Sequence, residues 1–321
     1  MMRSWTLLLS CAWLLFAAEA AAQEAYPAKP VKIVVPFPAA GNVDFLGRLF
    51  AEHFTHAMGQ TFIVENRPGA GTNIGSAAVA KSAPDGYTLL LGGSANSVNM
   101  TLYKAPGYDI VKDFVPIAAI ATVPNILLAR PGISVKSIEE LRDLSRSRSL
   151  SFASAGVGTP SHIAGEQFMR AAGMQMLHVP YKGAPAAATD VMAGRGDLLF
   201  ATIPATLGNI KSGRLIPIAV AGTTRSPAVP EVPTFSELGL RTYEASAWYG
   251  FLSPAGTPAE VVRRLSAEIN RLLASREVVD RLIENGAVPL PPSSPAEFAE
   301  FIKKDVESSR ALVKKAGIEM Q

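Results

Sequence analysis

The residues best suited to binding chemistry lie in two loops that follow apolar runs. After VKIVV the chain reads PFPAAGNVD, and after LSFAS it reads AGVGTPSH. Small residues between a strand and a helix leave backbone N–H groups free to point at one spot, and the first turn of a helix attracts anions. The two loops therefore predict an anion site built largely from main-chain groups.

Asn42 and Asp44 open the helix that follows the first of these loops. An Asn at such a position predicts an N-cap, and an acidic residue in the first turn interacts favourably with the helix dipole. We therefore expect Asn42 to cap the helix. For Asp44 a capping role is favoured over the alternative, in which its carboxylate faces the ligand and attracts an amine.

The sequence matches the motifs of catalytic, cofactor and metal sites only in part. The turn Gly69 to Gly75 reads G-x-G-x-x-x-G, and no acidic residue ends the next strand, so it departs from the dinucleotide fingerprint. The chain lacks G-x-S-x-G, and Ser154 and Ser161 have only His162 and His178 as bases. The four histidines show no HExxH spacing. We expect no catalytic residue, cofactor or metal, and a secreted hydrolase remains an alternative.

Residues 1–22 have the layout of a secretory signal. Arg3 precedes the apolar run LLLSCAWLLFAA, and the segment ends in three alanines, so we expect cleavage before Gln23 and a periplasmic location. The alternatives are a membrane anchor and a lipoprotein signal at Cys11, but the apolar run is shorter than the ~20 residues that span a bilayer. Cys11 is the only cysteine, so the mature chain would form no intrachain disulfide.

Composition predicts a folded chain that does not bind nucleic acid. The 321 residues are 48% hydrophobic, which is enough for full cores. The net charge is +3, and Lys and Arg are scattered without a basic stripe. Nucleic acid is therefore excluded as an expected partner, and the mild positive charge would assist the capture of anions.

Strand-like runs alternate with helical runs along the chain. Two helices show a clear apolar face. In the first, residues 43–57, the inward positions are Leu46, Leu49, Phe50 and Phe54; in the second, which begins at Pro160 with Thr159 as N-cap, they are Ile163, Ala164, Phe168 and Ala171. Apolar strands without alternation indicate parallel sheets covered on both sides.

The two βα series predict an α/β chain with two lobes and a cleft between them. We place residues 25–126 and 248–321 in lobe 1 and residues 127–247 in lobe 2. The stretch ASAWYGFLSP reads as a return strand, and the rest of the chain reads as mostly helical.

Five stretches follow one another in a characteristic order: YPAKPVKIVVPFPAAGNVDFLGRLFAEHF, VENRPGAGTNIGSAAVAKSAPDGYTLLLG, ASAGVGTPSHIAGEQF, HVPYKGAPAAATDVMAGRGDLLF and ASAWYGFLSPAGTPAEVVRRLSAEI. Together they closely resemble the Bug-type extracytoplasmic solute receptors, which are the TctC-like binding proteins of tripartite tricarboxylate transporters. The resemblance covers nearly the whole expected mature chain.

This resemblance implies a two-lobed periplasmic binding protein fold. The protein would be a monomer that closes on a small carboxylate, namely a di- or tricarboxylate, an acidic amino acid or an aromatic acid. It would present this ligand to a membrane permease, or alternatively signal to a membrane sensor protein. The residues that the resemblance places around the ligand are Phe37, Gly41, Asn42, Asp44, Ser94, Asn96, Ser154, Gly156, Thr159, His162 and Tyr181.

The chain departs from the family pattern at two places. Ala39 and Ala40 occupy positions in the first loop where relatives commonly carry glycines. The two alanines would narrow the pocket or stiffen the loop. Ala201 and Thr202 follow DLLF where many relatives carry an acidic residue. The second departure puts a preference for amino-bearing ligands in doubt and favours a plain dicarboxylate or an aromatic acid.

Overall fold

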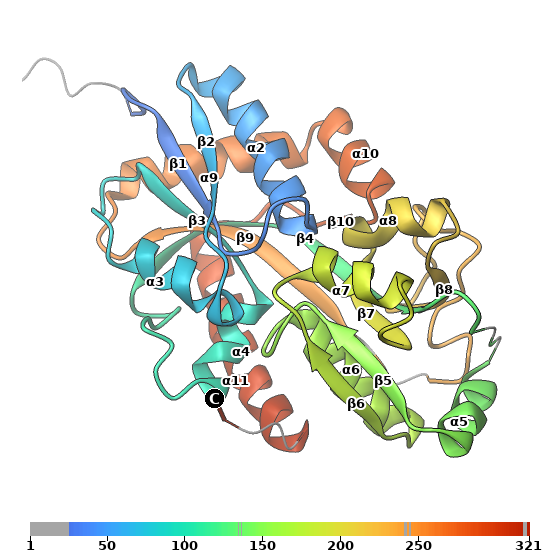
Figure 1. Ribbon diagram of the computed structural model, residues 1–321. Helices are drawn as coiled ribbons and strands as arrows, with labels where there is room; N and C mark the ends of the chain where they lie inside the picture. The colour runs from blue at the N-terminus through green and yellow to red at the C-terminus, as the bar shows by residue number, and fades with distance from the viewer. Residues whose placement is uncertain (1–25, 134, 136, 241–242, 244, 317–319) are drawn as a thin grey trace, which may run out of the picture.

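The computed structural model describes residues 26–133, 135, 137–240, 243, 245–316 and 320–321 (Figure 1). The expected signal peptide lies outside the described residues. Within them, no helix combines the length and the apolar character that crossing a membrane requires.

The first βα series forms a parallel sheet with helices on both faces. β1 (Val31–Val35) lies between β2 (Phe62–Asn66) and β3 (Thr88–Gly93) and is parallel to both. Ile33 belongs to an apolar cluster with α2 (Asn42–Met58), whereas Val34 belongs to a cluster on the opposite face. Both faces of β1 are apolar because both are covered, as the sequence predicts. The predicted inward face of α2 is confirmed, since Leu46, Leu49, Phe50 and Phe54 are all buried.

The second series repeats this architecture. β5 (Leu150–Ser154) is parallel to β6 (Met176–Pro180) and to β7 (Leu198–Thr202). One face packs against α5 (Ile138–Ser147) and α6 (Pro160–Ala172), and the other against α7 (Ala184–Met192) and α8 (Ile203–Lys211).

The predicted inward face of α6 needs one correction. Ile163, Ala164 and Phe168 are buried, but Ala171 is exposed and Ala172 is buried in its place. Positions four apart lie on one helix face, so Ala172 continues the stripe from Ala164 and Phe168.

Two long strands connect the two series. β4 (Phe114–Ala129) is antiparallel to β9 (Ser246–Pro254) as far as Pro124, and from Asn125 onward it pairs with β7 and, from Ile126, with β8 (Ile216–Val220). β9 also pairs with β3. The order of the sheet is therefore β2-β1-β3-β9-β4-β7-β5-β6. Strands that continue from one half to the other leave the connection hydrogen-bonded throughout.

The remaining elements complete the first half of the molecule. α11 packs against α4 and β4, and both helices lie beside the central strands in Figure 1. The bounds are η1 (Ala70–Thr72), α3 (Asn73–Ala80), α4 (Ser94–Leu102), α9 (Ala259–Leu273), α10 (Arg276–Glu284), β10 (Val288–Pro289) and α11 (Pro295–Ala316). An apolar cluster of Val98, Leu102, Ile163 and Val313 joins α4 and α11 to α6 of the second half.

Two helical glycines allow a matched test of packing. A Cβ added at Gly165 in α6 would lie 2.3 Å from Cε2 of Phe152, whereas one at Gly208 in α8 would have nothing within 4 Å. We expect Gly165→Ala to lower the free energy of unfolding by about 1–3 kcal/mol through overpacking. Gly208→Ala should raise it by up to about 1 kcal/mol through helix propensity. Urea unfolding measures both, and equal losses would contradict this account of the core.

Candidate functional site

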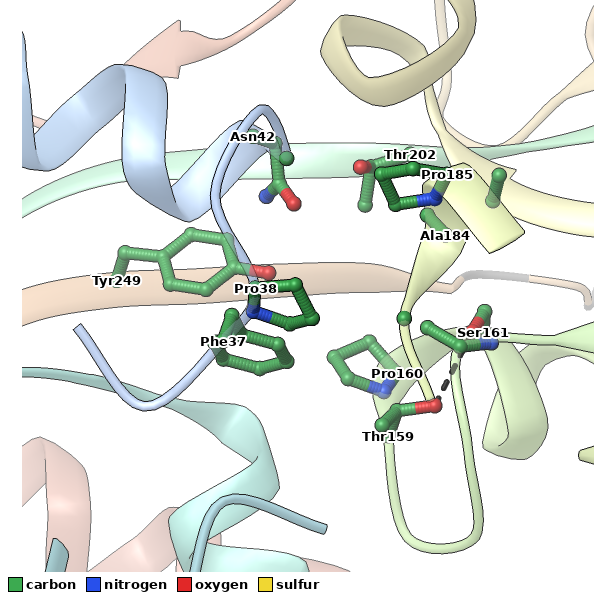
Figure 2. A pocket seen from close by; sticks show the side chains of 14 residues that line it. Phe37, Pro38, Asn42, Thr159, Pro160, Ser161, Ala184, Pro185, Thr202 and Tyr249 are labelled. Atoms are coloured by element: carbon green, nitrogen blue, oxygen red, sulfur yellow. Dashed lines mark hydrogen bonds between the residues drawn. The ribbon is translucent and has the colours of Figure 1, made fainter. Parts of the chain in front are cut away.

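The two predicted loops meet at a small, partly open cavity, which we call the head pocket (Figure 2). It has a cavity volume of about 30 Å³. Its lining residues are Phe37, Pro38, Gly41, Asn42, Ala155, Thr159, Pro160, Ser161, Gly183, Ala184, Pro185, Ala201, Thr202 and Tyr249. They come from both halves of the molecule, so the pocket exists only when the halves lie together.

A larger outer cavity of about 500 Å³ adjoins the head pocket. The two share Phe37, Pro38, Ala155, Thr159 and Gly183. The outer cavity is also lined by Pro36, Pro68, Gly69, Ala70, Gly71, Thr72, Tyr103, Gly156, Val157, Pro180, Tyr181, Lys182 and Gln321. A ligand with its end group in the head pocket would extend into this second space.

Four helices begin at the wall of the head pocket. α2, α6, α7 and α8 each follow a strand, and their N-cap residues are Gly41, Thr159, Gly183 and Thr202. None of these N-caps provides a side-chain hydrogen bond to its helix. The first N–H groups of a helix lack partners within it and carry its positive dipole end. The pocket therefore concentrates donors and positive potential without a cationic side chain.

The predicted capping role of Asn42 is wrong. Gly41, in extended conformation, is the N-cap of α2, and Asn42 is the first residue of the helix. The Asn42 side chain lies at the head pocket in Figure 2, and its Nδ2 atom is buried without a hydrogen bond of normal geometry. A buried amide donor without a partner is costly, so this atom is positioned for an acceptor from a ligand.

Two hydroxyl groups lie near Asn42. The side chain of Tyr249 is buried, and burial raises its pKa to about 12. The side-chain contact with Asn42 lowers the pKa, but by less than burial raises it. The phenol therefore keeps its proton at neutral pH. Thr202 is also buried, and its side chain faces Asn42 across the pocket in Figure 2.

Asp44 lies behind the first loop and is not among the lining residues of either cavity. Its carboxylate accepts hydrogen bonds from Ala40 N, Arg48 Nε and Asn66 Nδ2. Burial raises the pKa of Asp44, but these bonds outweigh it, so the net shift is downward. Ala40 has φ of 61°, a conformation that favours glycine, and the bond from its N–H to Asp44 holds it there. The position of Asp44 thus fits bracing of the loop.

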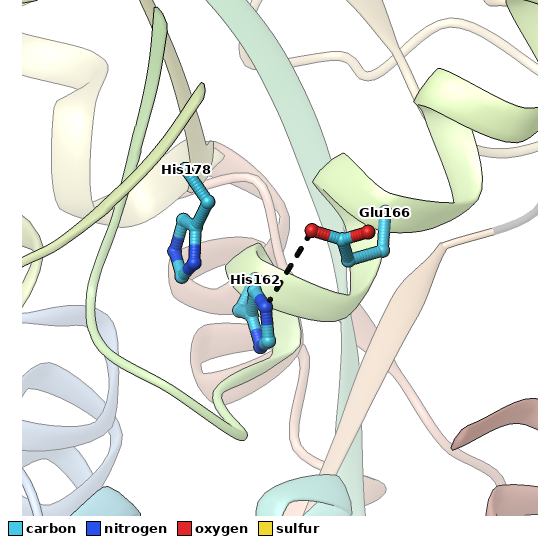
Figure 3. Close-up of side chains that lie close together, drawn as sticks. All are labelled: His162, Glu166 and His178. Atoms are coloured by element: carbon cyan, nitrogen blue, oxygen red, sulfur yellow. Dashed lines mark ion pairs between the residues drawn. The ribbon is translucent and has the colours of Figure 1, made fainter. Parts of the chain in front are cut away.

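The second loop is braced from behind by two stacked imidazoles (Figure 3). Gly158 N–H donates to His162 Nδ1 at 3.2 Å, and the Ser154 hydroxyl lies 2.7 Å from His178 Nε2. Gly156 N–H donates to Ser154 Oγ at 3.2 Å. The structure therefore places Ser154 and His162 as supports of the loop and not on the lining of the two cavities.

His162, Glu166 and His178 offer ligand atoms that lie within 4.8 Å of one another, which raises the question of a metal. The two rings are 4.1 Å apart and only 14° from parallel. Ring nitrogens bind metals in the plane of the ring, so the lone pairs of stacked rings cannot converge on one ion. In this arrangement the three residues form a packed support and not a converged set of metal ligands.

The other predicted residues fall into three places. Gly156 and Tyr181 line the outer cavity, and the Tyr181 hydroxyl donates to Asp190. Ser94 lines a separate cavity of about 110 Å³. Asn96 is fully buried, and its side chain bonds Gly93, Ser76 and Tyr108. Phe37, Gly41, Asn42 and Thr159 are the predicted residues that the head pocket brings together.

Tyr249 and the starts of α7 and α8 also line the head pocket. The stretches YKGAP and FATIP repeat the strand–loop–helix pattern of the two predicted loops, so the same reasoning could have found both helix starts. No local pattern marks Tyr249. It reaches the site because β9 crosses beneath the first loop, as Figure 2 shows.

The two buried histidines make the free energy of unfolding depend on pH. Burial lowers the pKa of His162 from 6.5 to about 4, and burial with the neighbouring His162 lowers that of His178 from 6.5 to about 3. Both rings are therefore neutral in the folded chain, while the unfolded chain takes up protons below pH 6.5. Their contribution to stability is complete above pH 6.5 and is lost progressively as the pH falls toward 3.

We expect His178→Gln to reduce the slope of the free energy of unfolding against pH by at most about 1 kcal/mol per pH unit, because one titrating group is removed. Thermal unfolding between pH 7 and pH 4 measures the slope. His56→Gln, at an exposed position on α2, is the matched control and should keep the original slope. A slope unchanged in His178→Gln would contradict the assignment.

The comparisons with known proteins agree with a binding site. The sequence profile described as "Tripartite tricarboxylate transporter family receptor" matches residues 46–318. Protein BugT of Bordetella pertussis is 33% identical over 302 residues, covering 93% of this chain and 92% of BugT. The solved structure of Rpa4515 of R. palustris with adipate has a TM-score of 0.88 at 33% identity, covering 92% of this chain and 99% of that one. MatC from Rhodopseudomonas palustris with bound malate has a TM-score of 0.84 at 30% identity, covering 90% and 100%.

Proposed function

Because this chain belongs to the family of tripartite tricarboxylate transporter receptors, the periplasmic solute-binding proteins of the Bug type, we propose that it captures a small organic carboxylate and delivers it to a membrane transporter. Export through the expected signal peptide and action as a monomer belong to this proposal. Similar proteins have been solved with adipate and with malate, both of which are dicarboxylates.

The observation that carries the proposal is the buried Asn42 amide, which has no hydrogen bond of normal geometry and lies where four helices begin. A carboxylate offers acceptor atoms in several directions, which matches the few polar groups of the pocket, since these can donate within a lining that is otherwise mostly apolar. The positive ends of the helix dipoles favour the negative charge. A hydrolase is not supported, because Ser154 is fully buried behind the loop.

The first test is isothermal titration of the refolded, ligand-free mature chain with adipate, malate, citrate and benzoate. We expect at least one acid to bind. Asn42→Ala should weaken that binding about tenfold through loss of one charge-assisted hydrogen bond. Asn42→Asp should abolish it, because it adds a negative charge at the carboxylate.

Gln175→Glu is the matched control for the added charge, since it makes the same amide-to-acid change at an exposed position. Its affinity should equal that of the unaltered chain. Binding to Asn42→Asp at full strength would remove Asn42 from the site. Failure of every acid to bind would reject carboxylate capture by the head pocket.

We further propose that the two lobes close around the ligand by a hinge at the crossing strands. The support is the change of partner strands at Pro124 and Asn125 of β4, together with a head pocket lined from both halves. Small-angle scattering should show a smaller radius of gyration with the bound acid than without it. Superimposable profiles would contradict hinge closure.

A further inference from the structure

The head pocket contains no charged side chain among the residues that line it. Its fourteen lining residues include no Asp, Glu, Lys, Arg or His. Its one titratable group is the Tyr249 phenol, which burial keeps protonated. Any charge on a ligand must therefore be balanced by dipoles and hydrogen bonds alone.

The polar groups of the pocket are arranged to donate. Asn42 Nδ2 contacts the Tyr249 hydroxyl but has no hydrogen bond of normal geometry, and four helices begin with their positive dipole ends at the same space, although Pro takes the first or second position in three of them. The hydroxyls of Thr202 and Tyr249 are free to donate as well. This set suits an anion and opposes a cation at the same place.

Two acidic side chains that contact the loops around the cavities already have partners. Asp44 accepts from Arg48, Asn66 and the N–H of Ala40. Asp190, which the Tyr181 hydroxyl reaches, is paired with Arg195. Neither acidic group remains to neutralise an ammonium group of a ligand.

From these observations, and resting on the proposed function, we infer that the site takes organic acids without an α-amino group and rejects α-amino acids. In an α-amino acid the ammonium group sits on the carbon next to the carboxylate. A carboxylate seated in a pocket of about 30 Å³ therefore brings the ammonium against the same lining, which is mostly apolar and has no charged side chain. A charge removed from water without a counter-charge is strongly unfavourable.

The rest of the acid lies in the outer cavity. Its volume of about 500 Å³ accommodates a longer body, and Tyr103 and three further prolines add apolar surface to it. Lys182 is the one lining residue with a charged side chain, and it is exposed; Gln321, the last residue of the sequence, lines the same cavity. Lys182 directly precedes Gly183, which lines both cavities, so a second carboxylate in the outer cavity would have a cation within the same lining.

The test uses pairs of ligands that differ only in the α-amino group. Titration of the mature chain compares adipate with L-2-aminoadipate, glutarate with L-glutamate, and succinate with L-aspartate. We expect the amino acid of each binding pair to bind at least about tenfold more weakly than its plain partner, which is about 1.4 kcal/mol.

A variant of Thr202 tests whether the absence of a counter-charge causes the discrimination. Thr202→Asp places a carboxylate in the head pocket, and Asp is well accepted at the N-cap of a helix such as α8. We expect this variant to weaken binding of the plain acid. The discrimination ratio, which is the affinity for the plain acid divided by that for its amino partner, should fall at least about tenfold. Thr202→Asn, which is neutral and of similar size, should keep the ratio of the unaltered chain.

The outcomes separate the two proposals. If plain acids bind and their amino partners bind equally or more tightly, the inference is overturned while carboxylate capture stands. If no acid of either kind binds, the proposed function fails with it. If Thr202→Asp and Thr202→Asn show the same ratio, the absence of a counter-charge is not the cause of discrimination. Should Thr202→Asp fail to fold, the ligand pairs on the unaltered chain still decide the inference.

Discussion

A buried hydrogen-bond donor must find an acceptor, and this constraint organises the centre of the molecule. Four helices begin at one small pocket without a side-chain hydrogen bond from their N-cap residues, and the buried Asn42 amide there has no hydrogen bond of normal geometry. Within the protein these groups have little to bind. Under the proposed function an acidic ligand would supply acceptors, and its binding would stabilise the arrangement in which both halves line the pocket.

The loops that carry these donors depend on supports at their backs. The first loop contains Ala40 in a conformation that favours glycine, and Asp44 holds it by accepting its N–H. The second loop contains Gly156 and Gly158, which are held by Ser154 and by the ring of His162. Polar side chains next to the site thus act on the main chain, and the main chain faces the ligand. This division explains why residues so close to the pocket are not on its lining.

The crossing strands reconcile two requirements that otherwise conflict. The pocket needs walls from both halves, yet the ligand needs an entrance. β4 runs through both halves as one strand of 16 residues and exchanges its partners at Pro124 and Asn125. A change of torsion angles at this point would move the halves as units, because each has its own apolar clusters on both faces of its strands.

Much of the fold could be predicted from local patterns. The apolar runs of β1 and β5, the inward stripe of α2, the return strand β9 and the C-terminal helices are all visible in the sequence, because burial on a strand or a helix face imposes its period on the chain. The two loops of the site were found in the same way. The motifs that resemble the receptor family predicted the family to which the chain belongs.

Only the tertiary structure decided where the side chains of the site point and which distant residues they contact. Gly41 and not Asn42 caps α2, because the Asn42 side chain turns toward a pocket formed by distant segments. Tyr249 joins the site from a strand more than 200 positions away in the sequence from the first loop, and no local pattern could announce it. The sequence by itself determined which segments are helices, strands and small-residue loops, since these depend on neighbours in the chain. The pairing of Asp44 with Arg48 and Asn66, and of Ser154 with His178, depends on how those segments pack in space.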